Sequence, residues 1–200
     1  MSIAVVDYGA GNLLSLTRAL TVIGADPHII TTPQEANDAQ IVILPGVGAA
    51  GSAMAALDAN GISAWLHATK TPILGICLGM QLLFERLEED DCTGLGVLSG
   101  SVQRLISRPD AKVPHMGWNQ VTWADGPTPA PYLYFAHSYH CVPTTIATYR
   151  TAWTEHGQPI LAELHTQGII GMQFHPEKSG EVGLRLLANA VATLRNEVRV

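Results

Sequence analysis

Short apolar runs alternate with stretches of helical spacing in the first half of the chain. We expect strands where the residues are mostly apolar and a turn follows, at 3–6, 28–31, 41–44 and 72–76. A helix is predicted after the first strand, with Asn12 as its N-cap and Gly24 as its stop, from the spacing of Leu13, Leu16, Leu20 and Ile23. Another helix is expected through 80–84. Apolar strands separated by helices are typical of a parallel sheet that is covered on both faces.

The pattern changes after about residue 95. Short β-rich runs with Gly and Pro between them predict antiparallel strands added to the sheet, at 101–105, 118–123, 132–136, 147–153, 159–164 and 169–174. A closing helix is expected over 180–194, where apolar residues recur every four positions, and the Pro-rich stretch 124–131 is interpreted as a loop. The sequence therefore predicts one domain over 1–200, of the three-layer α/β class, with a mixed but mainly parallel sheet.

Charge and composition exclude several classes of function. The net charge of −6 and the pI of about 5.7 argue against binding to nucleic acid or to an anionic membrane surface. No apolar run approaches the ~20 residues that span a bilayer, and we predict no signal peptide. The three cysteines cannot all pair, which favours free thiols and a cytoplasmic protein. Charged residues make up only 14% of the chain, which fits either a face covered by a partner or an alanine-rich composition.

The strongest chemical signal is the segment Gly75-Ile76-Cys77-Leu78-Gly79, between a predicted strand and a predicted helix. It matches the nucleophile elbow G-x-Nu-x-G, in which glycines permit a sharp turn that lifts the nucleophile above the sheet. The cysteine would sit at a helix N-terminus, where thiolate is favoured, and the N–H of Leu78 would face the attacked carbonyl. The alternative is a buried structural cysteine. The flanking glycines favour the functional interpretation.

A thiolate nucleophile needs a base and a group that orients the base. His175 ends a predicted strand, and Glu177, two residues later, can reach the same side. We expect Glu177 to hold the imidazole of His175 while that ring moves protons. A metal site could also be suggested by the cluster of His137, His140 and Cys141. Because side chains alternate faces along a strand, we predict no metal there.

The loop 44–51 follows the third predicted strand and is rich in glycine, so it could present backbone N–H groups to an oxyanion. It also matches the dinucleotide pattern G-x-G-x-x-G. That interpretation fails because the loop does not follow the first strand, and no acidic residue lies about 20 positions further on. Together the residues describe acyl transfer through a thioester. By themselves they indicate a cysteine hydrolase of a small amide or ester and go no further.

Two stretches carry a resemblance to a known family. GICLGMQLLFE at 75–85 and QFHPEKS at 173–179 resemble the class I glutamine amidotransferases, which implies a catalytic triad on Cys77, His175 and Glu177 and a flavodoxin-like core. Five stretches spread over the chain resemble one subgroup of that family, the glutaminase subunits of imidazole glycerol phosphate synthases: VVDYGAGNLLSL (5–16), LPGVGAAGSAM (44–54), VPHMGWN (113–119), YFAHSYHC (134–141) and GMQFHPEKSG (171–180).

This resemblance implies that glutamine is hydrolysed to glutamate and ammonia. The ammonia would pass through a tunnel to a separate (βα)₈-barrel cyclase subunit in a heterodimer. There it would serve the formation of imidazole glycerol phosphate and an aminoimidazole carboxamide ribotide in histidine biosynthesis. No cofactor and no metal are implied. The low charge content would then reflect the face that docks on the cyclase.

Roles for further residues follow from the resemblance. The oxyanion donors are expected to be the N–H groups of Val47 and Leu78, in a loop that includes Gly48. We expect the peptide at 46–48 to start misoriented and to turn when the partner binds its ligand, because glycines flank it. Candidates for holding the substrate are Gly46, Gln81, His137, Ser138 and Tyr139. Candidates for facing the partner are Asn12, Met116, Trp118, Tyr134 and Lys178.

Three alternatives stay open at the level of the sequence. The chain could be the glutaminase of another amidotransferase, serving anthranilate, guanine-nucleotide or pyridoxal phosphate synthesis. The motifs DYGAGN and PGVG argue against this. It could be a stand-alone cysteine hydrolase or chaperone on a related fold, which would need no partner. It could also be a catalytically silent subunit that regulates a synthase, against which the intact triad argues.

Overall fold

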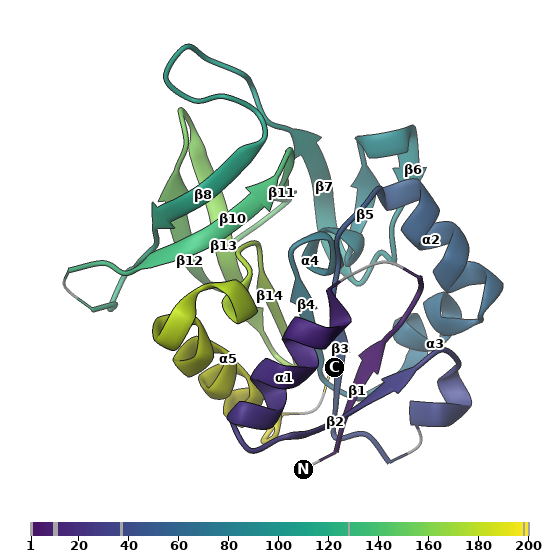
Figure 1. The fold of residues 1–200 in the computed structure, drawn as a ribbon. Coiled ribbons are helices and arrows are strands. Elements are labelled where there is room, and N and C mark those ends of the chain that lie inside the picture. The colour runs from purple at the N-terminus through teal and green to yellow at the C-terminus, as the bar shows by residue number, and fades with distance from the viewer. Residues whose placement is uncertain (1, 10–11, 37, 128, 198, 200) are drawn as a thin grey trace.

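A mixed eight-stranded sheet forms the centre of the molecule (Figure 1). The structure, a computed structural model, describes residues 2–9, 12–36, 38–127, 129–197 and 199. Five strands run parallel, in the order β2 (Asp26–Ile30), β1 (Ser2–Val6), β3 (Ile41–Leu44), β4 (Ile73–Ile76) and β14 (Ile169–Met172). Three antiparallel strands extend this sheet: β13 (Pro159–Thr166), β12 (Arg150–Glu155) and β9 (Thr122–Trp123). The predicted class of sheet, mixed but mainly parallel, is confirmed.

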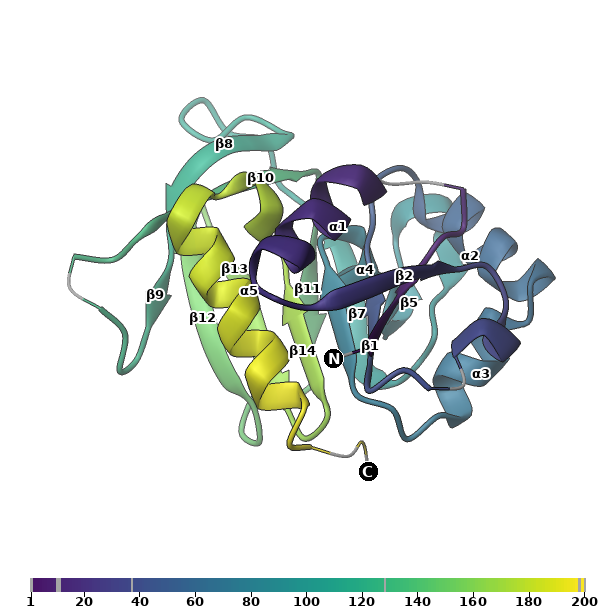
Figure 2. The same ribbon diagram turned by 60° about the horizontal axis from the view of Figure 1, so that its bottom comes forward.

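Helices cover both faces of the sheet, so the three-layer prediction is also confirmed (Figures 1 and 2). On one face lie α1 (Leu13–Val22) and α5 (Gly180–Leu194). On the other lie α2 (Ala50–Ala59), α3 (Ile62–Ala68) and α4 (Leu78–Leu82). Short 3-10 turns occupy η1 (Pro33–Ala36), η2 (Glu89–Asp91) and η3 (Pro176–Lys178). In the described part of the chain, no helix is long and apolar enough to cross a membrane.

Several strands of the second half do not join the main sheet, contrary to the prediction. One smaller sheet contains β11 (Tyr139–Pro143), β7 (Leu98–Arg104), β5 (Phe84–Leu87) and β6 (Cys92–Thr93), and another pairs β10 (Tyr132–His137) with β8 (His115–Gln120). The strand predicted at 169–174 is antiparallel to β13 but parallel to β4. A hydrophobic pattern reveals which face of a strand is buried, but not which neighbour it pairs with.

The expected helix through 80–84 ends earlier, because α4 stops at Leu82 and Phe84 already begins β5. The residues from Leu78 to Phe84 are all buried, so the run has no periodicity that could mark the end of the helix. The closing helix has the predicted bounds, and Asn12 caps α1 by accepting a hydrogen bond from the Ser15 N–H at 3.3 Å.

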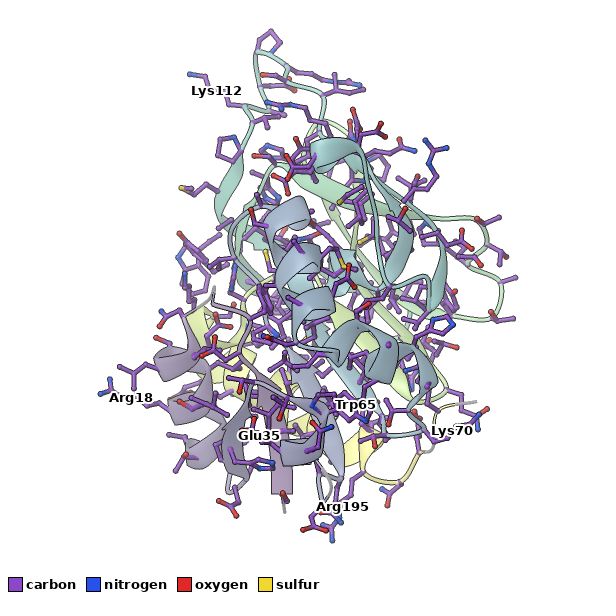
Figure 3. All side chains as sticks on the ribbon, turned by 90° about the vertical axis from the view of Figure 1, so that its right-hand side faces the viewer. Arg18, Glu35, Trp65, Lys70, Lys112 and Arg195 are labelled. Atoms are coloured by element: carbon purple, nitrogen blue, oxygen red, sulfur yellow. The ribbon has the colours of Figure 1, made fainter. Side chains whose placement is uncertain are left out.

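The carboxyl ends of the parallel strands meet at one edge of the sheet, and each is followed by a segment with predicted chemistry. β3 leads into the glycine loop, β4 into Cys77 and β14 into His175. Open α/β sheets bind their ligands at this edge. The segment that carries Lys112, ahead of β8, projects at one end of the molecule, whereas Arg195, after α5, lies at the other (Figure 3).

Candidate active site

Cys77 stands in a strained turn between β4 and α4. Its backbone has φ 53° and ψ −110°, a combination that a non-glycine residue rarely adopts and that clusters at functional sites. The N–H of Cys77 donates to the Met172 carbonyl at 2.7 Å, so the nucleophile is still tied to the sheet. Because α4 has only five residues, its macrodipole at the sulfur is small.

The two glycines of the elbow are required by close packing. A Cβ at Gly79 would lie 1.7 Å from the Leu44 carbonyl oxygen, and one at Gly75 would lie 2.8 Å from the backbone of Met80. Neither backbone can retreat, since β3 and α4 are both buried. The sequence predicted a sharp strand-to-helix turn at the G-x-C-x-G pattern, and the structure adds that its glycines are needed because the turn is pressed against its neighbours.

His175 and Glu177 meet as predicted. The Nδ1 of His175 lies 2.9 Å from Oε1 of Glu177, and both side chains are almost fully buried. Burial by itself would lower the pKa of His175, but its contacts with Cys77 and Glu177 outweigh burial and raise that pKa to about 10. The other ring nitrogen, Nε2, has no hydrogen-bond partner among the described residues. It is therefore free to exchange a proton with Cys77.

A serine that the sequence analysis did not single out holds the triad segment in place. The hydroxyl of Ser179 donates to the His175 carbonyl at 2.6 Å and accepts from the Tyr134 N–H at 3.0 Å. The His175 N–H in turn donates to the Tyr134 carbonyl at 2.8 Å. Two of these bonds join β10 to the turn that carries the catalytic pair, and the third lies within the turn. The one signal in the sequence for this role of Ser179 was a serine placed shortly before a predicted helix.

The glycine loop lies directly against the elbow. A Cβ at Gly46 would lie 2.5 Å from the Gly79 nitrogen and 2.5 Å from Cβ of Leu78, so the backbones of the loop and the elbow touch. The Tyr8 hydroxyl, which was not predicted, donates to the Pro45 carbonyl at 2.8 Å and anchors the start of the loop. Val47 is partly exposed, and Gly48 has φ 105°. The two predicted oxyanion segments are thus brought together beside Cys77.

The candidates for holding the substrate surround the site unevenly. Gln81 is buried, and its amide donates to the Tyr139 carbonyl at 2.8 Å and to Oε1 of Gln173 at 3.0 Å. Tyr139 turns its ring toward Arg104, and the side chain of His137 is bound within the interior. Ser138 accepts the Leu105 N–H through its carbonyl. The stretch 136–139, which joins β10 to β11, approaches Cys77 through its backbone, at the Ala136 carbonyl.

Gln173 is the residue next to the nucleophile that sequence reasoning missed. It has no exposed surface, and its Nε2 donates to the Cys77 sulfur at 3.7 Å. The sulfur in turn donates to the Ala136 carbonyl at 3.8 Å. The available signal was a glutamine within an otherwise apolar run from 169 to 174, since a buried polar residue needs a reason.

Most of the residues predicted to face a partner form one exposed patch beside the site. Trp118 and Tyr134 are paired across β8 and β10, with ring centroids 6.0 Å apart, and Nζ of Lys178 lies 5.7 Å from the Tyr134 ring centroid. Met116 and Trp118 are 65% and 55% exposed, unusual for such large apolar side chains. Asn12 is exposed at the start of α1. We call Met116, Trp118, Tyr134 and Lys178 the aromatic patch.

The fold and the site define a class of protein. The family model for "Glutamine amidotransferase class-I" matches residues 4–194. Two solved structures share the fold. One, a glutamine amidotransferase, has a TM-score of 0.75 at 15% identity over 95% of this chain and 98% of that one, and the other, PurLQS from Thermotoga maritima, has 0.70 at 19% over 96% and 98%. The chain belongs to the class I glutamine amidotransferases.

Curated relatives narrow this further. The chain is 40% identical to imidazole glycerol phosphate synthase subunit HisH of Nostoc punctiforme, over 98% of each chain. It is 42% identical to the HisH subunit of Thermosynechococcus vestitus over 98% of each, and 44% identical to that of Synechococcus elongatus over 94% of this chain and 92% of the relative. Within the class, the chain therefore falls in the HisH family.

Proposed function

We propose that this chain is the glutaminase of an imidazole glycerol phosphate synthase and supplies ammonia for histidine biosynthesis. The observation that carries the proposal is the buried triad, with Cys77 in a strained elbow and His175 bonded to Glu177 at 2.9 Å. The kinship with HisH subunits points to the pathway.

The residues support a two-stage reaction. The Cys77 thiolate attacks the side-chain carboxamide carbon of glutamine, and a C–S bond forms as the carbonyl oxygen becomes an oxyanion. The N–H groups of Val47 and Leu78 would hold that oxyanion. Collapse breaks the C–N bond, and His175 gives its proton to the departing ammonia. A water that loses its proton to His175 then attacks the thioester, the C–S bond breaks, and glutamate leaves while the Cys77 thiolate and the protonated His175 are restored.

We further propose that the partner is a (βα)₈-barrel cyclase subunit, held in a cytoplasmic heterodimer against the aromatic patch. The patch lies beside the site, because Tyr134 and Lys178 belong to the elements that carry or adjoin His175. A barrel docked there could receive ammonia without exposing it to bulk water. The chain would act as one domain, without cofactor or metal.

The test is glutamate release from glutamine, measured for the chain alone and then with a cyclase subunit and its ribonucleotide ligand. We expect low activity alone, a steep rise in the complex and no activity in Cys77→Ala. Full activity without a partner would instead indicate a stand-alone hydrolase. Unchanged synthase output after alkylation of Cys77 would indicate a silent regulatory subunit.

A further inference from the structure

Polar side chains buried behind Cys77 form a continuous hydrogen-bonded path. It begins at Gln173, whose Nε2 donates to the sulfur at 3.7 Å and whose Oε1 accepts from Gln81 at 3.0 Å. Gln81 also donates to the Tyr139 carbonyl, at 2.8 Å. The links of Gln173 to the sulfur and to Gln81 are buried, and the link of Gln81 to the Tyr139 carbonyl is partly buried.

The path continues beyond the Tyr139 carbonyl into strand β8. That carbonyl also lies within hydrogen-bond distance of Nδ1 of His137, at 2.8 Å. Nε2 of His137 lies 2.9 Å from Nδ1 of His115. Nε2 of His115 lies 3.2 Å from the side-chain nitrogen of Asn119. Burial lowers the pKa of His137 to about 3 and that of His115 to about 4, so both rings are neutral.

Neutral rings and known acceptors assign a direction to every link. A carbonyl can only accept, so His137 carries its hydrogen on Nδ1 and accepts on Nε2. His115 must then donate from Nδ1 and accept from Asn119 on Nε2. The Tyr139 carbonyl is therefore the point at which donors from His137 and Gln81 converge.

The same reasoning orients the Gln173 amide. Gln81 donates its two side-chain N–H groups to two oxygens, the Tyr139 carbonyl and Oε1 of Gln173. If the Gln173 amide rotated by half a turn, its NH₂ group would face the NH₂ group of Gln81, and its oxygen would face the sulfur. The two facing NH₂ groups would be unfavourable in a buried site, and so would an amide oxygen facing the thiolate form of Cys77. The sulfur therefore always meets an N–H donor.

We propose that Gln173 is a positioning residue, held by Gln81, that keeps the Cys77 sulfur in place and stabilises it as thiolate. When Cys77 is a thiol it donates to the Ala136 carbonyl at 3.8 Å, and the thiolate, whose proton is on His175, lacks that bond. The Gln173 donor remains, and a hydrogen bond to a charged acceptor is stronger than one to a neutral thiol. Its contribution therefore grows as the nucleophile forms, which raises kcat more than it lowers KM. The expected effect on kcat rests on the proposed function.

The test compares Gln173→Met, of similar shape but without the donor, with the wild-type chain. Alkylation of Cys77 by iodoacetamide, followed across pH by peptide mass spectrometry, needs no glutamine. We expect slower alkylation at neutral pH and a profile displaced to higher pH. In the active complex, kcat should fall about 10- to 100-fold, as expected for one hydrogen bond to a charged group, with KM within about threefold.

Gln158→Met is the matched control, since Gln158 is half-buried and bonds His140 at 3.0 Å outside the path. It should leave alkylation and kcat unchanged. Gln173→Glu, also of native shape, keeps an oxygen for Gln81 but puts a carboxyl oxygen at the sulfur. It should slow alkylation at least as much as Gln173→Met, and it serves if the methionine variant does not fold.

A double-mutant cycle tests the link to Gln81. If Gln81 acts by holding Gln173, the double variant Gln81→Met/Gln173→Met should alkylate no more slowly than Gln173→Met alone. The proposal would be overturned if Gln173→Met were alkylated at the wild-type rate and kept the wild-type kcat. It would also be overturned if the effects of the two substitutions on alkylation were additive. A wild-type chain that alkylates normally but releases no glutamate with its partner would overturn the proposed function and leave the positioning result standing.

Discussion

The N–H of His175 donates to the carbonyl of Tyr134 at 2.8 Å, which ties the catalytic base to the strand that presents the aromatic patch. Tyr134 thus has two roles in one residue. Its ring lies between Trp118 and Lys178, and its backbone holds the triad turn. A partner that pressed on the patch would act on the backbone of the catalytic base without any long-range path.

Ser179→Ala should weaken this connection. The buried hydroxyl holds both Tyr134 and His175, and its removal leaves the Tyr134 N–H without an acceptor. We expect the free energy of unfolding to fall by about 2 kcal/mol and glutaminase kcat in the complex to fall with it. Urea unfolding and glutamate release would measure the two effects. Ser63→Ala in α3 is the control, and an equal loss there would show that the Ser179 bonds are not special.

Trp118→Ala should weaken binding of the partner without destabilising the chain. The side chain is 55% exposed, so its removal leaves no cavity in the core. We expect the Kd for the cyclase subunit to rise about 30-fold, equivalent to about 2 kcal/mol, with the Tm unchanged. Titration calorimetry would measure it. Val22→Ala is the control, because the Val22 side chain is 71% exposed at the C-terminal end of α1 and lies outside the aromatic patch. It should leave the Kd for the cyclase subunit unaltered. Equal Kd values for Trp118→Ala and the wild type would exclude the patch as the interface.

Val47→Pro tests the oxyanion loop. Proline removes the N–H of residue 47, while Val47→Ala keeps it. We expect ligand-stimulated kcat to fall by about 10²- to 10³-fold in the proline variant, because one oxyanion donor is lost, with glutamine binding retained. The alanine variant should stay within about threefold of wild type. Full stimulated activity in Val47→Pro would assign the oxyanion to other donors.

Stability should fall on acidification from about pH 6.5. The pKa of His137 is lowered to about 3 by burial and by the neighbouring His115, and that of His115 to about 4 by burial and by His156. Between the unfolded value near 6.5 and these values, the unfolded chain binds more protons than the native chain. The free energy of unfolding therefore decreases as pH falls through this window, by up to about 1.4 kcal/mol per pH unit for each ring.

The opposite sign applies to His175. Its pKa is raised to about 10, so its contribution to stability is present below about pH 6.5 and is lost as pH rises toward 10.

Urea unfolding at several pH values would give the slopes of both effects. His137→Gln should reduce the acid slope by about one proton. A slope identical to wild type would mean that His137 is protonated in the native chain at these pH values.

The sequence by itself determined the elements whose pattern is local. The apolar runs at 41–44 and 169–172, the cap at Asn12, the closing helix and the elbow around Cys77 all follow from neighbouring residues. The pairing of His175 with Glu177 was also predictable, because the two residues lie on one short turn. The motifs were specific enough to indicate the family without the fold.

Only the tertiary structure decided which distant segments meet. The placement of Gln173 against the Cys77 sulfur spans 96 positions, and the contact of Tyr8 with the loop at Pro45 spans 37. Likewise, β8 and β10 pair with each other outside the main sheet, which leaves Trp118 exposed beside Tyr134. Periodicity records the face that a residue turns to the core, whereas its partner on that face is set by how the sheets and helices pack.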